Sequence, residues 1–226
     1  MEYLLDTINI AIIKELNDLL PITGITSNPS IIKAEGKINF FNHFREIRKI
    51  IGNNKTLHIQ VVAQDYEGML KEAKAILDNV DDKVFIKVPV TEQGLKTIRA
   101  LKAEGISVTA TAIYTKTQGL LAMEAGADFI APYFNRMENM DIDACKTIKA
   151  FADAISKYNY KTKILAASFK NIAQVNNAFE NGAQTATVNP SILRDALKMP
   201  AIQKAVDDFS ADWENIFGKN ISIIDL

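Results

Sequence analysis

The feature that most constrains this chain is a short run of β-branched and other apolar residues that recurs eight times. The runs cover residues 3–7, 25–28, 57–62, 84–90, 108–113, 129–134, 163–168 and 185–189. Longer segments with apolar residues at helical spacing lie between them, such as residues 66–77 and 92–103, the latter preceded by Thr91 as a predicted N-cap. A strand followed by a helix, repeated eight times, predicts an α/β fold, the eight-stranded parallel (β/α)8 TIM barrel.

The chain length agrees with one such barrel. Barrels of this kind often exceed 200 residues without dividing, so we expect a single domain over residues 1–226. After the last run, residues 190–197 and 201–217 have helical patterns, and the second carries Ile202, Val206, Phe209, Trp213 and Phe217. This extra C-terminal helix could pack on its own barrel or on a neighbouring subunit, and the pattern alone leaves both open.

Charge and cysteine usage exclude several classes of partner. The chain has 26 basic and 27 acidic side chains, a net charge of −1, so nucleic acid and anionic membrane surfaces are not expected partners. No stretch approaches the ~18 apolar residues of a membrane span. Cys145 is the only cysteine, which excludes an intrachain disulfide or a thiolate zinc cluster. Because the N-terminus lacks a signal-peptide pattern, we expect a cytoplasmic protein.

Alternation along the strands sorts their side chains into two faces. In residues 84–90 the β-branched residues face the helices, which leaves Phe85, Lys87 and Pro89 facing the lumen. Applied to the other strands, the same alternation places a further set inside: Leu4, Asp6, Thr26, Asn28, His58, Gln60, Thr109, Thr111, Phe129, Ala131, Tyr133, Ile164, Ala166 and Ser168. The late members are polar and lie at the carboxyl ends of the strands, where barrel enzymes carry their active sites.

Lys87 is the candidate with the most specific chemistry. An ammonium in an apolar wall is costly, and the usual relief is a lowered pKa and a neutral amine, which is a nucleophile toward carbonyl groups. The alternative is a structural ion pair with Asp6 across the lumen. Asp6 could instead cap a helix, Asn28 could form an Asx turn before Pro29, and Gln60 could be a satisfied core amide.

A second group of candidates follows the sixth and seventh strands. Tyr133 could relay a proton, and Arg136 offers a planar fork suited to phosphate, unless it pairs with Glu138 on the surface. Ser168 precedes a predicted helix whose N-terminal amides could hold the same phosphate. His43 and His58 are expected to be structural. Since no Gly-rich loop, paired carboxylates or metal-ligand spacing occurs, we expect neither a cofactor nor a metal.

Several segments together resemble the transaldolase family, in particular its short subgroup of fructose-6-phosphate aldolases and transaldolase-like proteins. The resemblance is carried by Leu-Asp-Thr at 5–7, Gly-Ile-Thr-Ser-Asn-Pro-Ser at 24–30 and Ile-Lys-Val-Pro-Val-Thr at 86–91. It continues in residues 109–114, 131–136 and 166–170, so it covers the chain nearly end to end. Ser27 and the Asn-Pro pair at 189–190 depart from the forms typical of the better-known aldolases.

The resemblance implies a barrel that forms a Schiff base through Lys87. It further implies that Asp6, Asn28 and Thr26 bind substrate hydroxyls, that Gln60 and Thr111 hold a water, and that Tyr133 transfers protons. Arg136 and Ser168 would bind the phosphate. The small members of the family form rings with an exchanged C-terminal helix, which implies a homo-oligomer such as a pentamer or decamer. The expected partners are then small sugar phosphates.

Two positions bear on which reaction the resemblance implies. Transaldolases proper have Glu at the position of Gln60 and Phe at that of Tyr133, whereas the aldolase subgroup has Gln and Tyr. This favours cleavage and formation of fructose 6-phosphate from dihydroxyacetone and glyceraldehyde 3-phosphate. Transfer of the three-carbon unit between sugar phosphates is the alternative. Two alternatives come from other functional classes. One is a phosphate-binding isomerase in which Lys87 acts only as a cation. The other is a protein that binds a sugar phosphate without turnover.

Overall fold

The strands close into a parallel barrel in which each strand pairs with its neighbours in chain order. A computed structural model describes all residues, 1–226, and divides them into two compact units, Met1–Pro190 and Ser191–Leu226. The first unit holds the closed barrel. Its strands are β1 Glu2–Asp6, β2 Ile22–Thr26, β3 Thr56–Gln60, β4 Phe85–Pro89, β5 Val108–Ile113, β6 Phe129–Pro132, β7 Lys163–Ala166 and β8 Thr185–Val188. The predicted TIM barrel is confirmed.

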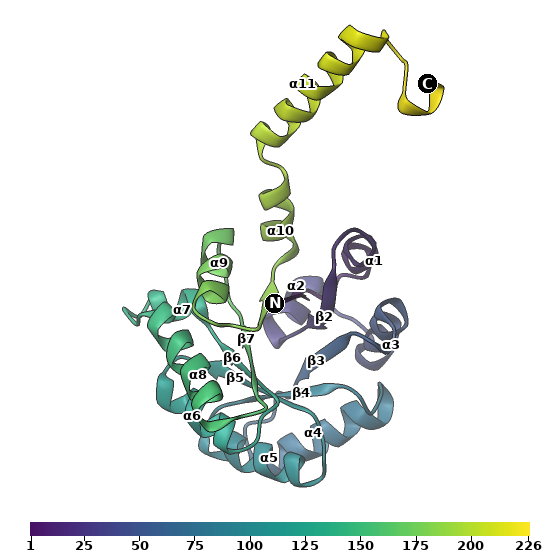
Figure 1. The fold of residues 1–226 in the computed structure, drawn as a ribbon. Helices are drawn as coiled ribbons and strands as arrows, with labels where there is room; N and C mark the ends of the chain where they lie inside the picture. Colours follow the sequence, from purple (N-terminus) through teal and green to yellow (C-terminus); the bar gives the residue numbers. More distant parts are fainter. The chain divides into compact units, whose positions relative to one another are not determined.

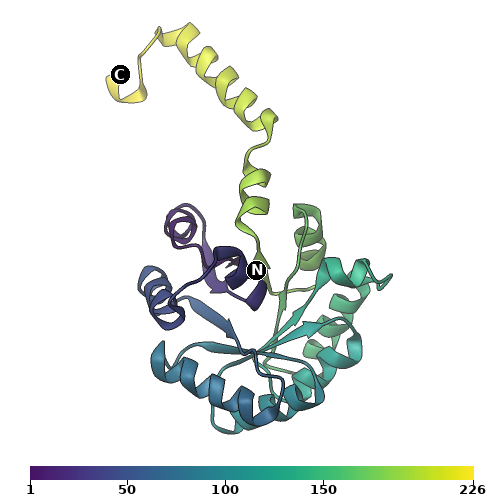
Figure 2. The same cartoon turned by 180° about the vertical axis from the view of Figure 1, so that it is seen from behind.

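Helices surround the strands, as both views of the ribbon show (Figures 1 and 2). They are α1 Ile10–Leu19, α2 Pro29–Glu35, α3 Phe40–Ile51, α4 Tyr66–Asn79, α5 Glu92–Ala103, α6 Lys116–Glu124, α7 Phe134–Glu138, α8 Ala144–Tyr158 and α9 Ile172–Glu180, with α10 Pro190–Leu197 following β8. The predicted helices at 92–103 and 190–197 match these bounds. Strand β2 begins three residues earlier than predicted, at Ile22.

The loops that leave the strands end in residues that cap the next helix. Asn28 caps α2, Asp65 caps α4, Thr91 caps α5, Thr115 caps α6 and Asn171 caps α9, each through a side-chain oxygen that accepts a backbone N–H. Such caps satisfy amides that the first helical turn leaves without a partner. They fix the residue at which each helix begins, shortly after the carboxyl end of a strand.

The lumen has an apolar floor below its polar end. Leu4, Phe129 and Leu165 form a buried cluster there, and Phe85 packs against it. His58 stacks on the Phe85 ring, with 4.8 Å between centroids, and hydrogen bonds through its two ring nitrogens to the hydroxyls of Thr109 and Thr56. The structural role expected for His58 agrees with these contacts. The floor closes the barrel beneath any ligand at the opposite end.

Strand β7 departs from the predicted alternation. Leu165, rather than Ile164 or Ala166, joins the cluster inside the lumen. All three residues are fully buried, so β7 is apolar on both faces and its sequence holds no alternation to interpret. The predicted inward placement of Ile164 and Ala166 is therefore wrong. Ser168 lies beyond the end of the strand with φ of 63°, a left-handed turn that changes the direction of the backbone.

The second unit, Ser191–Leu226, contains α10 from its second residue onward, α11 Pro200–Phe217 and a 3₁₀ turn, η1 Ile223–Asp225. Helix α11 buries none of its residues, although Phe209, Ile216 and Val206 are apolar and 70%, 75% and 50% exposed. The chain after α11 turns back so that the Trp213 indole N–H donates to the Ile221 carbonyl at 2.7 Å. No helix of the chain combines the length and the apolar character that spanning a membrane requires.

Candidate active site

A cavity of about 320 Å³ lies at the carboxyl ends of the barrel strands. Its wall combines strand residues with residues of the loops that follow the strands. The lining residues are Asp6, Asn28, Pro29, Ser30, Gln60, Lys87, Ala112, Tyr114, Tyr133, Arg136, Ala167, Ser168 and Thr187. This is the end of the barrel at which catalytic residues are expected.

Lys87 reaches this cavity from the middle of β4. Its side chain is almost wholly buried, with 3% of the residue exposed, and its Nζ donates to the backbone carbonyl of Ser27 at 2.9 Å. Burial lowers the pKa of the amine, and the nearby Asp6 charge raises it in part. No carboxylate lies within ion-pair distance of Nζ, so the structural ion pair with Asp6 is absent. An amine held in this way is available as a nucleophile.

Asp6 ends β1 within a small network of hydroxyl groups. The Thr26 hydroxyl donates to Asp6 Oδ1 at 2.7 Å and lies 2.5 Å from the Thr187 hydroxyl. Burial raises the pKa of the Asp6 carboxyl, while Lys87 and the hydrogen bond from Thr26 lower it. Asp6 does not cap α1, since Asn9 does so. The network therefore holds the carboxyl in the cavity, where it faces a ligand.

Gln60 ends β3 beside Lys87, its register partner on β4. Its Oε1 is buried and has no hydrogen-bond partner within the protein. An amide that is satisfied within the core would have a hydrogen-bond partner for this oxygen. Gln60 is therefore not a satisfied core amide. A buried acceptor without a partner is costly and is expected to bind a water or a ligand hydroxyl.

Tyr133 follows β6, and its phenol lies 3.0 Å from the Thr111 hydroxyl of β5. Burial raises the pKa of the Tyr133 phenol, while the hydrogen bond with Thr111 and the charge of Arg136 lower it. The phenol therefore keeps its proton near neutral pH and can donate it, and it can accept a proton only after it has given up its own. Thr111 orients this hydroxyl and does not itself line the cavity.

Arg136 lies on α7 with its guanidinium 4.8 Å above the Tyr133 ring. Its Nη1 donates to the Tyr114 hydroxyl at 3.1 Å, and this bond raises the pKa of Arg136 further. Tyr114 in turn packs edge-on against Tyr133, with 5.5 Å between ring centroids. The expected alternative, a pair with Glu138, is absent because Glu138 accepts from Gln174 instead. The cation is therefore free to bind an anion at the cavity wall.

Asn28 and Ser168 are the remaining predicted residues that line the cavity. Asn28 does form the Asx-type cap, since its Oδ1 accepts from the amides of Ser30 and Ile31 at 2.9 and 3.1 Å. It also lines the cavity, so capping and ligand binding are compatible: the oxygen is used by the cap and the amide N–H groups remain. Ser168 lines the cavity through its left-handed turn.

The structure thus brings together most of the residues predicted from the sequence. Lys87, Asp6, Asn28, Gln60, Tyr133, Arg136 and Ser168 line one cavity, whereas Thr26 is fully buried and bonded to Asp6, so it supports the site from behind. Sequence reasoning missed Tyr114 and Thr187. The alternation of Thr185 and Thr187 in β8 could have identified the latter, but nothing local marks Tyr114.

Comparisons with known proteins agree with this geometry. The model of the transaldolase/fructose-6-phosphate aldolase family matches residues 3–223. A probable fructose-6-phosphate aldolase of Streptococcus pneumoniae (strain ATCC 700669 / Spain 23F-1) is 55% identical over 213 residues, which span 94% of this chain and 96% of the relative. A match of this extent leaves no part of the barrel unaccounted for. The chain belongs to the transaldolase/fructose-6-phosphate aldolase family.

Proposed function

We propose that this protein is a Schiff-base aldolase that cleaves and forms fructose 6-phosphate, with dihydroxyacetone and glyceraldehyde 3-phosphate as the other reactants. The single observation that supports this most is the buried amine of Lys87, which has a lowered pKa, no ion pair and a place in the cavity wall. A relative that matches 94% of this chain is named a probable fructose-6-phosphate aldolase. An isomerase would need Lys87 as a cation, which its burial disfavours.

In the cleavage direction, the Lys87 nitrogen adds to the ketone carbon of the sugar, and the carbonyl oxygen leaves as water. The resulting iminium accepts the electron pair of the bond between the third and fourth carbons as the hydroxyl on the fourth carbon loses its proton to the water bound beside Gln60. Glyceraldehyde 3-phosphate departs, its phosphate bound by Arg136 and Ser168. A proton from Tyr133 then converts the enamine to an iminium, and water hydrolyses it to dihydroxyacetone and the free amine.

The remaining polar residues bind the substrate and the water. Asp6 and Asn28 are placed to bind hydroxyl groups of the donor, and Gln60 Oε1 to accept from the hydrolytic water. The aldolase is favoured over the transaldolase because Tyr133 and Gln60 together supply a proton and a water for release of dihydroxyacetone. A transaldolase would instead keep the enamine until a second aldose phosphate arrives.

We also propose that the protein is a homo-oligomer in which α11 packs on a neighbouring subunit. The support is the apolar set on α11, whose members Phe209, Ile216 and Val206 are 70%, 75% and 50% exposed. Exposed apolar surface of this extent is typical of an interface. The ring of five or ten subunits that the resemblance implies, and the cytoplasmic location, remain predictions.

The test is incubation with fructose 6-phosphate, with and without erythrose 4-phosphate. We expect free dihydroxyacetone without the acceptor; product only in its presence would identify a transaldolase. Borohydride should trap a covalent adduct on Lys87. The Lys87→Met variant should lose cleavage by more than about a thousandfold, whereas Lys83→Met, an exposed lysine before the same strand, should retain it. Retained cleavage in Lys87→Met would refute the proposal.

A further inference from the structure

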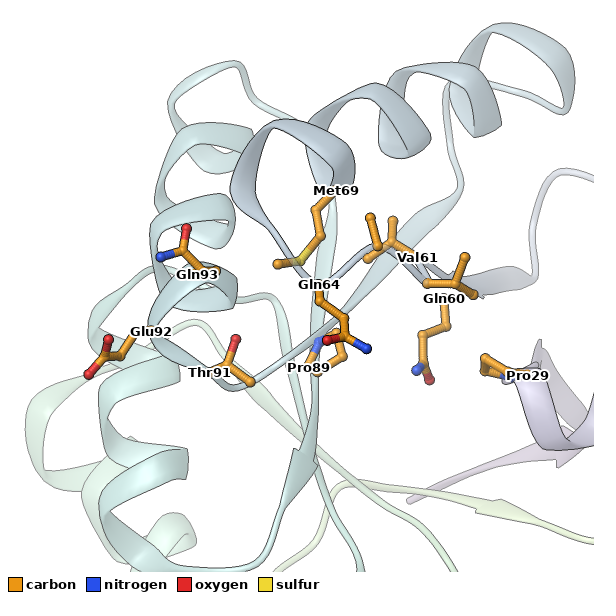
Figure 3. A pocket seen from close by; sticks show the side chains of 11 residues that line it. Pro29, Gln60, Val61, Gln64, Met69, Pro89, Thr91, Glu92 and Gln93 are labelled. Carbon is orange, nitrogen blue, oxygen red and sulfur yellow. The ribbon is translucent and has the colours of Figure 1, made fainter.

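Two cavities adjoin at the carboxyl end of the barrel, and they differ in the charged residues that line them. The larger, about 700 Å³ in volume, lies where β3 and β4 end, and Figure 3 shows its lining side chains. Gln60 lines both cavities. Glu92 is the only charged residue that lines the larger one, whereas Arg136 and Ser168, the residues proposed to bind phosphate, line the catalytic one. The guanidinium that can bind a phosphate therefore lies on the α7 side of the barrel.

The side chain of Gln174, on α9, makes three hydrogen bonds that join the two segments of this phosphate site. Gln174 is buried, with 8% of the residue exposed. Its Nε2 donates to two residues of α7, to Glu138 Oε2 at 2.5 Å and to Asn135 Oδ1 at 3.2 Å. Its Oε1 accepts from the backbone N–H of Lys170 at 2.7 Å. One buried amide thus connects α7 with the loop that carries Ser168.

Helix α7 depends on such outside contacts because it is only five residues long. A helix this short has little stability of its own, since helix formation is cooperative. The backbone N–H groups of Phe134 and Asn135 donate to the carbonyls of Ala167 and Ser168 at 2.8 and 2.9 Å, which fixes the first turn. Gln174 bonds to α7 on both sides of Arg136, one residue before it and two residues after it. The place of the guanidinium therefore depends on this amide.

Gln174 also gives the Glu138 carboxylate a partner other than Arg136. The two charged residues are two positions apart on α7, and a carboxylate that paired with the guanidinium would compete with a phosphate for it. The bond from Gln174 Nε2 to Glu138 Oε2 satisfies one carboxylate oxygen with a neutral donor. Arg136 then stays available to an anion in the cavity.

We propose that Gln174 is a positioning residue for phosphate recognition, which orients Arg136 relative to Ser168 and keeps the Glu138 carboxylate from the guanidinium. The inference rests on the proposed function and adds to it a residue that does not line the cavity. Gln174 touches neither the phosphate nor the reacting atoms. Its loss should therefore weaken binding of a phosphorylated substrate and leave the chemistry at Lys87 unchanged.

The test measures addition of dihydroxyacetone to glyceraldehyde 3-phosphate and to glyceraldehyde, which lacks the phosphate. Gln174→Met keeps the length of the side chain and removes its three hydrogen bonds. We expect the KM for glyceraldehyde 3-phosphate to rise roughly tenfold, with the KM for glyceraldehyde and both kcat values within about twofold of the natural protein. An equal rise for both aldehydes would overturn the positioning role and leave the aldolase assignment intact. If the natural protein adds dihydroxyacetone to neither aldehyde, the aldolase assignment itself is refuted.

Gln184→Met is the matched control. Gln184 Oε1 accepts from the backbone N–H of Ile164 at 2.8 Å, near the start of β7 and thus at the opposite end of the strand that leads to Ser168. The substitution removes a bond from a backbone amide to a glutamine side chain, as Gln174→Met does. It should lower the midpoint of urea unfolding and leave the ratio of the two KM values unchanged. A ratio that changes equally in both variants would show that it reports on stability, which would overturn the proposal.

Inorganic phosphate gives a second measurement that needs no turnover. An anion that binds the folded protein raises its unfolding temperature, and sodium chloride at equal ionic strength corrects for general salt effects. We expect Gln174→Met to need a roughly tenfold higher phosphate concentration than the natural protein for the same rise. Asn135→Ala removes one acceptor of Gln174 on α7 and should shift the response in the same direction by less, so it serves as the test if Gln174→Met does not fold. An unchanged phosphate response in either folded variant would contradict the proposal.

Discussion

At the scale of single residues, burial acts on Lys87 and Asp6 in the same sense: it disfavours the charge on each. It lowers the pKa of the amine and raises that of the carboxyl, and each residue offsets part of the effect on the other. The coupling acts without a direct ion pair. The reactivity of Lys87 therefore depends on a balance between the barrel interior and one carboxyl group.

This balance predicts the effect of Asp6→Asn on pH dependence. The substitution removes the negative charge that raises the pKa of Lys87 while leaving an oxygen that can accept from Thr26. The pKa of Lys87 should fall further, so the rate of imine trapping, which rises as the amine loses its proton, should reach its midpoint at a lower pH. Asp18→Asn, an exposed carboxylate on α1, should leave the midpoint in place. A midpoint that moves upward in Asp6→Asn contradicts the coupling.

Tyr114 is a residue whose contribution only the structure reveals. Its hydroxyl accepts from Arg136, and Tyr114→Phe removes that bond while keeping the ring against Tyr133. Since Arg136 is partly exposed, we expect a loss of about 1 kcal/mol, or roughly fivefold in KM for fructose 6-phosphate, with kcat within about twofold. The KM for unphosphorylated fructose should not change. Equal loss with both sugars would show that Tyr114 acts on the fold rather than on phosphate binding.

At the scale of elements, the sequence predicts best where a strand has two different faces. In β4 the alternation of β-branched residues with Phe85, Lys87 and Pro89 assigns the lumen face correctly. In β7 both faces are apolar, so alternation carries no information and the assignment fails. The start of β2 was missed for a related reason: Pro21 and Gly24 interrupt the pattern that marks a strand.

The contact between α5 and β4 predicts an unusual effect of a helix glycine. Helix propensity alone suggests that Gly94→Ala would stabilise the protein by about 1 kcal/mol. A Cβ at Gly94 would however lie 1.9 Å from the Pro89 carbonyl oxygen, which is backbone and cannot move aside. We expect Gly94→Ala to destabilise by more than about 2 kcal/mol in urea unfolding. Because Pro89 is two residues from Lys87, activity should fall as well.

Ala103→Gly provides the control for that experiment, since it changes the same helix at an exposed position. Because Ala103 is the last residue of α5, the substitution should cost less than about 1 kcal/mol through propensity and leave activity unchanged. If Gly94→Ala proves more stable than the natural protein, α5 is free to shift from the end of β4. The close contact between Gly94 and the Pro89 carbonyl would then not be what determines the geometry of the site.

At the scale of the whole molecule, the candidate site is assembled from residues far apart in the chain. The barrel topology predicted from eight repeats is sufficient to bring Asp6, Lys87 and Tyr133 to one end, because parallel strands present their carboxyl ends together. The topology does not predict how neighbouring loops are oriented relative to one another. The hydrogen bond from Arg136 to Tyr114 depends on this orientation, and no local pattern in the sequence predicts it.

The exposed face of α11 carries the last prediction, which concerns assembly. Phe209 and Ile216 lie on one side of the helix, and Ala211, also exposed, lies on the opposite side by helical spacing. If the apolar side packs on a neighbouring subunit, Phe209→Asp should lower the molar mass in light scattering toward that of the 25.0 kDa chain, because burying a carboxylate there costs several kcal/mol. Ala211→Asp adds the same charge outside the expected contact and should leave the assembly intact. An unchanged mass in Phe209→Asp, or equal dissociation in both variants, would show that this face does not hold the subunits together.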